Sequence, residues 1–198
     1  MKNHVLQILL VLAVGLAGNK VDAGITGDMA SKIDGNSYKL KDAEKYIRAE
    51  ATGKSLVKFL SPSTQKVQGK STFTGEKTND TELFLFKHFQ VKFGSQATAG
   101  TEPIEAISMT DAVPPSLEKA HLVVNVNNKE KINIPLSVLR NKGVDNDTMA
   151  SYYEFLQDGS YFDMGKQISI EIEIPDATVV PSDKKYYIEV AFLGVDLV

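Results

Sequence analysis

The chain has 198 residues, a formal net charge of −3 and no cysteine. This length suits one full-sized domain and is short for two. The acidic balance argues against a dedicated nucleic-acid binder, which usually carries a basic face, and the lack of cysteine excludes disulfides, thiol nucleophiles and thiolate metal sites.

Residues 1–23 form an apolar N-terminal segment that admits two interpretations. Lys2 precedes an apolar run from Val5 to Gly18, and Val21 to Ala23 offers the small residues that a signal peptidase prefers. The run is short for a membrane span, which needs roughly 20 apolar residues. We expect either a cleaved signal peptide or a retained helical arm, covered by a neighbouring subunit or by a lipid surface through residues 5–16.

Residues 24–80 are interpreted as a linker and an arm. Gly24 to Ser37 is rich in Gly, Asp, Ser and Asn, which is typical of a linker. The stretch 40–51 is predicted to be a helix, because apolar residues recur there at helical spacing and Glu44 and Arg48 form an i,i+4 pair. Its apolar face contains Leu40, Ala43, Tyr46, Ile47 and Ala51, and Gly53 suits the position after its end.

Short apolar islands interrupt the polar residues that follow. They lie at 56–60 and 71–74, and we predict short edge strands or an extended arm there. From Thr81 onward the pattern becomes that of β-strands. Glu82 to Phe93 is apolar on both faces at first and on one face later, which indicates a sandwich strand with something packed over its outer face.

Shorter elements occupy the middle of the chain. Residues 105–110 are a candidate strand. The runs 119–127 and 131–135 flank the segment Asn127-Asn128-Lys129-Glu130, which predicts a hairpin.

The segment 145–159 is ambiguous. Ser151 to Glu154 fits a capping box and Gly159 fits a helix end, so a short helix is predicted there. A strand of a barrel-like sandwich is the alternative.

Two long strands dominate the last third of the chain. Gln167 to Ile174 alternates isoleucine with polar residues, and Pro175 stops it because proline cannot donate to a β-ladder. In Lys184 to Val198, an apolar set alternates with Tyr187, Glu189 and Ala191. We expect one core between two sheets to contain Ile168, Ile170, Ile172, Ile174, Ile188, Val190 and Phe192.

The predicted fold is mainly β. Runs of strands without regular βαβ alternation favour an antiparallel β-sandwich of jelly-roll type over 81–198, with short helices in the connections and the N-terminal helical arm before it. Seven to nine strands are expected.

The polar residues reveal no reaction centre. The histidines His4, His88 and His121 have no second ligand at metal-binding spacing, and no nucleotide-binding or hydrolase motif occurs. His88 and His121 are interpreted as histidines on the polar face of a strand.

Acidic clusters and tyrosines are the remaining candidate binding groups. The loops 145–148 and 158–163 gather oxygen ligands but do not match a calcium-binding loop, so turn chemistry is the preferred interpretation. Glu171 and Glu173 share a strand face and could act as a glycosidase pair, but a role in solubility and in preventing edge aggregation is favoured. Adjacent tyrosines are expected to point one inward and one outward, among Tyr152, Tyr153, Tyr161, Tyr186 and Tyr187.

The last strand ends in the pattern Phe192-Leu193-Gly194-Val195-Asp196-Leu197, and His121 to Asn127 followed by Lys131 to Leu136 is similar in style. In this pattern the chain, from about Thr81 to Val198, resembles the single jelly-roll major capsid proteins of icosahedral tailless viruses, which often contain a membrane. The resemblance implies a last strand in the middle of a sheet.

The resemblance also implies a structural virion protein that is not an enzyme. We expect it to self-assemble into an icosahedral shell, with no catalytic, cofactor-binding or metal-binding residues and with no sequence-specific nucleic-acid partner. Its partners would be its own copies and other virion proteins, with contact to an internal lipid membrane through residues 5–16. An exported bacterial β-sandwich for binding or adhesion is the alternative, and a hydrolase that uses Glu171 or Glu173 is a remote third hypothesis.

Overall fold

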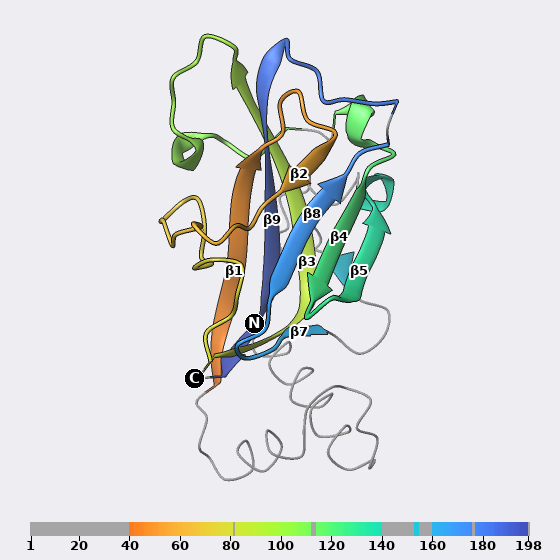
Figure 1. Ribbon diagram of the computed structural model, residues 1–198. Helices are drawn as coiled ribbons and strands as arrows, with labels where there is room; N and C mark the ends of the chain where they lie inside the picture. Colours follow the sequence, from red (N-terminus) through yellow and green to blue (C-terminus); the bar gives the residue numbers. More distant parts are fainter. Residues whose placement is uncertain are drawn as a thin grey trace.

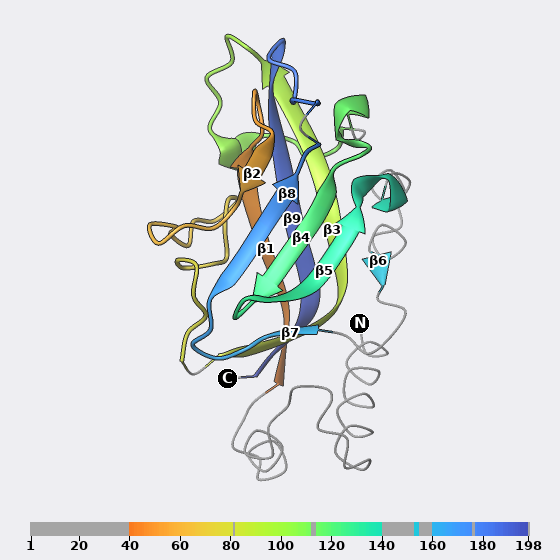
Figure 2. The same ribbon diagram turned by 45° about the vertical axis from the view of Figure 1, so that its right-hand side comes forward.

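The computed structural model describes residues 40–80, 82–111, 114–139, 153–154, 160–175 and 177–197. They form two antiparallel β-sheets stacked face to face, as Figures 1 and 2 show. The predicted mainly β class is therefore confirmed. The apolar N-terminal segment, 1–23, and the linker predicted over Gly24 to Ser37 lie outside the described residues.

The first sheet, sheet A, has five strands. Its order is β1 (Leu40–Glu50), β9 (Lys184–Leu197), β3 (Leu83–Ala97) and β6 (Tyr153–Glu154), and β7 (Ser160–Phe162) also pairs with β3. The last strand of the chain thus lies between β1 and β3. Both neighbours run antiparallel to it, and the register pairs Leu40 and Leu83 with Leu197.

The second sheet, sheet B, has four strands. Its order is β2 (Leu56–Lys58), β8 (Ile168–Glu173), β4 (His121–Val126) and β5 (Lys129–Pro135). The predicted hairpin is confirmed as β4 and β5. Asn127 and Asn128 form its turn with φ of 51° and 60°, the left-handed conformation that asparagine tolerates better than most residues.

The core lies between the two sheets. In β8, the isoleucines are buried while Ser169 and Glu171 are only partly covered, which is the alternation that the sequence indicates. All seven residues expected to share one core do so, together with a set of phenylalanines from β3, β7 and β9. The prediction of the core register is confirmed.

Residues 40–50 form strand β1, so the helix predicted over 40–51 is wrong. Positions four residues apart lie on one face of a helix and also on one face of a strand, so Ala43, Ile47 and Ala51 fit both patterns. An isolated helix of this length is marginal, whereas β9 offers an eleven-residue partner. Arg48 accordingly pairs with Glu189 of β9.

Strand β9 is buried on both faces rather than on one. Tyr187, Glu189 and Ala191, the set expected opposite the core, are also buried. When a strand is central in its sheet and covered on its outer side, neither face contacts solvent. Its outward residues therefore need not be polar.

The connections carry short 3₁₀ helices. These are η2 (Ile104–Ala106), η3 (Pro115–Leu117) and η4 (Leu136–Leu139). The strand predicted at 105–110 is wrong, because η2 occupies its start and Asp111 makes only an isolated bridge to Phe93. In the segment 145–159, Tyr153 and Glu154 form strand β6, which favours the strand alternative there, and the other residues lie outside the described ones.

Strands β1 and β2 precede the domain boundary predicted at Thr81. The described sandwich therefore starts at Leu40, and residues 40–58 belong to its two sheets rather than to an arm.

Candidate functional site

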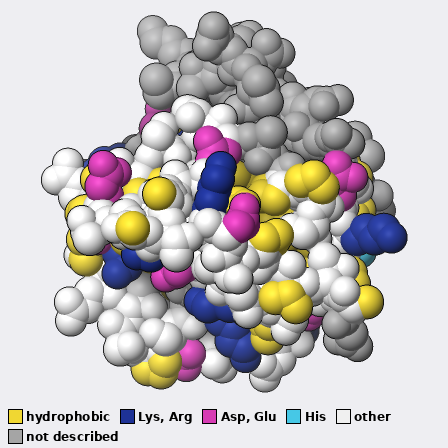
Figure 3. Space-filling view, turned by 90° about the horizontal axis from the view of Figure 1, so that it is seen from above, with side chains coloured by type: hydrophobic (Ala, Val, Ile, Leu, Met, Phe, Trp, Pro, Cys, Tyr) yellow, Lys and Arg dark blue, Asp and Glu magenta, His cyan; other side chains and the backbone are white. Residues whose placement is uncertain are grey.

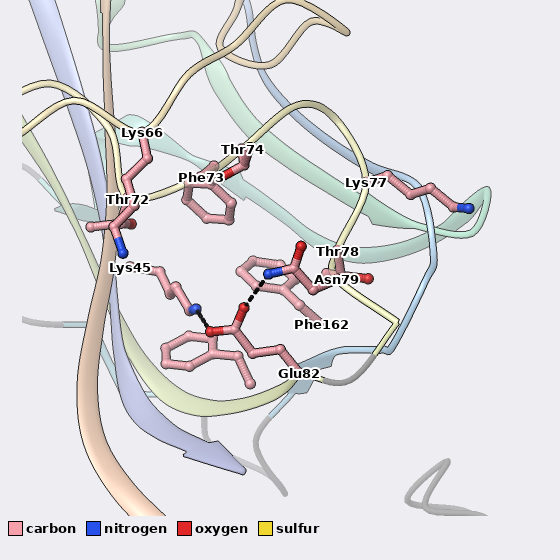
Figure 4. Close-up of a pocket in the computed structure, with 11 residues that line it drawn as sticks. Lys45, Lys66, Thr72, Phe73, Thr74, Lys77, Thr78, Asn79, Glu82 and Phe162 are labelled. Atoms are coloured by element: carbon pink, nitrogen blue, oxygen red, sulfur yellow. Dashed lines mark hydrogen bonds and ion pairs between the residues drawn. The ribbon is translucent and has the colours of Figure 1, made fainter. Parts of the chain in front are cut away.

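A small polar hollow lies between the lower end of sheet A and the connection from β2 to β3 (Figure 4). Its volume is about 90 Å³. Lys45 enters from β1, Phe84 from β3 and Phe162 from β7. The β2–β3 connection supplies the remaining lining residues, which are Lys66, Thr72, Phe73, Thr74, Lys77, Thr78, Asn79 and Glu82.

Lys45 is held by two carboxylates in this hollow. Its Nζ donates to Glu82 Oε1 at 2.6 Å and lies 3.1 Å from Asp196 Oδ1. Asn79 Nδ2 donates to the other Glu82 oxygen at 3.0 Å, so Glu82 points between Lys45 and Asn79, as Figure 4 shows. Lys45 Nζ also lies 5.5 Å from the centre of the Phe84 ring, close enough for a cation–π contact.

The two carboxylates titrate differently because their surroundings differ. Burial raises the pKa of Glu82, but the hydrogen bond and charge of Lys45 outweigh burial and leave that pKa below its ordinary value. Burial raises the pKa of Asp196, and the charge of Lys45 offsets this only in part while Glu82 adds repulsion. The fold thus stabilises the ionised form of Glu82 and disfavours that of Asp196.

The chemistry of the hollow is that of a closed ion-pair cluster. Lys45 is engaged by both carboxylates, and the Thr78 hydroxyl donates to the backbone carbonyls of Asp163 and Lys166. A nucleophile needs an adjacent base that is free to take its proton. Both carboxylates beside Lys45, those of Glu82 and Asp196, are already paired with its ammonium group.

The candidate pair Glu171 and Glu173 lies on the outer face of sheet B. Ser169 Oγ donates to Glu171 at 3.0 Å, and Lys58 Nζ lies 3.7 Å from the same carboxylate. Glu173 is exposed beside a shallow groove, opposite His121 in the register. These contacts suit a solvated face, and Lys58 and Ser169 were not identified from the sequence as partners of Glu171.

The histidines have different surroundings. His121 Nδ1 lies 2.8 Å from Asn133 Oδ1, and Asn133 Nδ2 donates to Glu130. His121 thus lies on the polar face of its strand, as predicted. His88 lies on the outer face of sheet A and is buried there rather than exposed to solvent. His4 lies outside the described residues.

The acidic loops show turn chemistry where they are described. Asp163 Oδ1 accepts the backbone N–H of the next residue, Met164, at 2.8 Å, so this side chain hydrogen-bonds the backbone of its own turn. Among the described residues, no group of three or more His, Cys, Asp or Glu side chains could hold a metal ion. The loop 145–148 lies outside those residues.

The tyrosines occupy both faces of sheet A. Tyr186 packs against the core, whereas Tyr187 lies on the outer face and accepts a hydrogen bond from Gln96 Nε2 at 2.5 Å. The expected division of this pair is confirmed. Lys131 Nζ lies 4.5 Å from the ring centre of Tyr161, while Tyr152 is outside the described residues.

A second ion-pair cluster, absent from the sequence interpretation, lies on the outer face of sheet A. Glu189, 5% exposed, accepts from Arg48 Nε at 2.7 Å and lies 3.1 Å from Lys92 Nζ. Arg48 Nη1 also donates to the carbonyls of Ile104, Glu105 and Ile107, each at 3.2 Å. The cluster anchors the connection between β3 and β4, and no sequence spacing could reveal it because its members are far apart in the chain.

Comparison of the chain with protein-family models, with curated proteins and with solved structures finds no match. Within the part of the chain that the structure describes, no helix is long and apolar enough to cross a membrane.

Proposed function

We propose that the chain is a jelly-roll capsid subunit that self-assembles into an icosahedral shell. The observation that carries this proposal is the order of the strands. Leaving β7 aside as a second partner of β3, the pairs are nested along the chain, because β1 pairs with β9, β2 with β8, β3 with β6, and β4 with β5.

Nested pairs arise when a long antiparallel hairpin is rolled up. Successive pairs then alternate between two sheets, and β9 beside β3 and β8 beside β4 join them. This arrangement supports the proposed jelly roll, an architecture used by capsid proteins, lectins and cupins. The central place of β9 also agrees with the resemblance carried by its Gly194-Val195-Asp196 pattern.

The packing of the interior favours a capsid subunit over a jelly roll that encloses a ligand. Phe86, Phe162 and Phe192 fill it, with ring centres 4.7 to 5.1 Å apart. The hollow beside Lys45 has only about 90 Å³, well below the roughly 300 Å³ at which small-molecule pockets begin. A filled interior supports a role through surfaces.

The upper surface of the molecule agrees with partners other than nucleic acid. Figure 3 shows basic, acidic and hydrophobic side chains interspersed there, without a field of one sign. The partners proposed are copies of the same chain and other virion proteins, in a virion, with residues 5–16 as a candidate contact to an internal membrane.

Sedimentation and electron microscopy of the full-length protein test this function. We expect closed, symmetric assemblies that form above a threshold concentration, because closed symmetry buries equivalent surfaces on every copy. The chain without residues 1–23 should remain folded and assemble poorly. Monomers of the full-length protein over a hundredfold range of concentration would contradict the proposal.

The mass of the protein isolated from cells separates this function from the alternative. An intact N-terminus at Met1 supports the capsid subunit. A start at Gly24, together with a monomeric protein outside the cell, would favour the exported binding module with a cleaved signal peptide.

A further inference from the structure

The ion-pair cluster around Lys45 joins the first and the last described strands. Lys45 lies on β1 two residues from Ile47, and Asp196 lies on β9 four residues from Phe192. Ile47 and Phe192 belong to the core between the sheets, so the side chains of Lys45 and Asp196 also lie on the inner face of sheet A. The two side chains therefore meet at the lower end of the interior.

Small residues leave room for this meeting. Ala43 and Gly194 pair with each other in the register and lie between Lys45 and Asp196 on the same face. One carries a methyl group and the other no side chain, so the Lys45 stem can extend along the sheet. Its Nζ lies 3.1 Å from Asp196 Oδ1.

This contact is incomplete as an ion pair. Lys45 Nζ donates its hydrogen bond to Glu82 at 2.6 Å, whereas Asp196 Oδ1 is buried and has no hydrogen-bond partner among the described residues. A buried polar atom without such a partner costs free energy, and so does a buried charge. Condensation of the amine with the carboxyl group would remove both costs, because the product is a neutral amide.

The surroundings favour that condensation. The side chains of Lys45 and Asp196 are only 14% and 13% exposed, and Phe84 pairs with Asp196 in the register. The rings of Phe84 and Phe162 are buried and line the same hollow. Such apolar walls exclude water and favour neutral groups over ions.

The three polar groups also have complementary protonation states. Burial raises the pKa of Asp196, which increases the share of its neutral form, the form that an amine attacks. Lys45 lowers the pKa of Glu82, so that carboxylate stays ionised and in contact with the protons of Nζ. An ionised base beside a nucleophile is the arrangement that activates an amine. The cluster is closed to an outside substrate, but its members can react with one another.

We propose that Lys45 and Asp196 condense to an amide bond within the chain, with Glu82 as the base. Glu82 takes one proton from the ammonium group, and the neutral Nζ attacks Cγ of the protonated Asp196 carboxyl group. Glu82 passes that proton to the leaving hydroxyl group, which departs as water. It then takes a second proton from the nitrogen and releases it to solvent. One C–N bond forms and one C–O bond breaks, so no oxidant, reductant or further reactant is needed.

The bond would tie the chain close to where it enters and leaves the sandwich. Leu40 and Leu197 pair with each other, so tension on the two ends of the chain first acts to separate β1 from β9. An amide between these strands would bear that tension in place of hydrogen bonds. It would also close the loop from residue 45 to residue 196, which restricts the unfolded chain. The bond does not depend on the capsid function, and the pH response of the ion pair belongs to the chain before the bond closes.

Peptide mapping by mass spectrometry tests the bond in the full-length protein, folded and kept at neutral pH. We expect a branched peptide that joins the segments containing Lys45 and Asp196 and is lighter than their sum by one water molecule. Lys45→Arg keeps the charge, but its guanidinium group is not a nucleophilic amine, so the branched peptide should be lost. Glu82→Gln retains both reactants and should slow the appearance of the branched peptide at least a hundredfold, because it removes the base.

Lys92→Arg is the matched control, because Lys92 Nζ also lies 3.1 Å from a carboxylate of β9, that of Glu189. This variant should form the branched peptide as the parent does. Circular dichroism checks that each variant folds, and the map of the parent decides even if a variant does not. A folded parent that yields only separate peptides after several days would overturn the proposal. A loss of water that persists in Lys45→Arg would do the same, because it would place the dehydration elsewhere.

Discussion

At the scale of single residues, Gly194 shows how one side chain is excluded by the backbone of a neighbouring strand. The pairing of β3 with β9 shifts between Phe86 and His88, a β-bulge that inserts Lys87. Gly194 pairs with Phe86 at this irregularity, and a Cβ atom on it would overlap the carbonyl oxygen of Leu85. Backbone cannot rotate away as a flexible side chain can, so the position requires glycine.

Gly194→Ala should therefore lower the free energy of unfolding by about 3 kcal/mol, the upper end of the usual cost of overpacking. Urea unfolding measures the change. Gly53→Ala is the control, because Gly53 has a φ of +65° but open space around it, and its loss should be only about 1 kcal/mol. Equal losses at the two positions would show that the bulge is not the constraint.

The cluster around Lys45 predicts a pH dependence with a defined sign. Because the pKa of Glu82 is lowered from 4.5, its ionised form stabilises the fold above that pH, and this contribution disappears as the pH falls through the lowered pKa. Glu82→Gln should cost about 1 kcal/mol at pH 7, and the cost should shrink below pH 4.5. Denaturant unfolding at several pH values measures it.

Asp196→Asn is the matched comparison in the same cluster. The pKa of Asp196 is raised above 3.8, so the folded protein binds its proton more tightly and loses stability as the pH rises through the raised pKa. At pH 7 this substitution should be neutral or stabilising. A loss at pH 7 as large as that of Glu82→Gln would contradict the assignment of opposite shifts.

At the scale of elements, β8 illustrates how alternation specifies a strand. Ile170 is 1% exposed and pairs with Val124 of β4, and its carbonyl accepts the N–H of Phe59. Each strand of sheet B thus depends on the register of its neighbours, because a shift by one residue would turn the isoleucines toward solvent.

Ile170→Asp should abolish soluble folding, since it places an unpaired charge in the core. The measurement is the soluble fraction after expression together with a thermal melt. Glu173→Asp, an aspartate at an exposed position near the end of the same strand, should leave both unchanged. A soluble Ile170→Asp protein with the parent melting curve would refute the core register.

At the scale of the whole molecule, the first and last described strands, β1 and β9, pair with each other. β1 pairs with β9 over eleven residues, and Ile47, Val57 and Phe59 contribute to the core from the N-terminal quarter of the sandwich. Contacts between such distant parts of the chain form late in folding, because closing long loops costs entropy before the contacts reward it.

A chain that starts at Thr81 should therefore fail to unfold cooperatively, because β9 loses a neighbour and the core loses its covering residues. A chain that starts at Gly24 retains β1 and β2 and should keep a cooperative transition. Thermal melts followed by circular dichroism compare the two. A cooperative transition of the shorter chain would mean that the sandwich folds without its first two strands.

The local sequence pattern was sufficient to predict those elements that are marked by alternating residues or by a turn sequence. The isoleucines of β8 and the Asn127-Asn128 turn carry their conformation in neighbouring residues, so they could be predicted. The hollow beside Lys45 could not, because Glu82 of the β2–β3 connection and Asp196 of β9 are far apart in the chain. The same holds for Glu189, whose partner Arg48 is 141 positions away.

The sequence by itself determined the mainly β class, the hairpin and the set of side chains that share the core, because burial on one side of a strand imposes a period of two on neighbouring residues. Only the tertiary structure decided that residues 40–50 are a strand, that β9 is buried on both faces and which strands are neighbours. Those outcomes depend on what packs beside each segment. Positions four residues apart share a face in a helix and in a strand alike, so the spacing of Ala43 and Ile47 is compatible with both. Pairing with β9 over eleven residues is what makes this segment a strand.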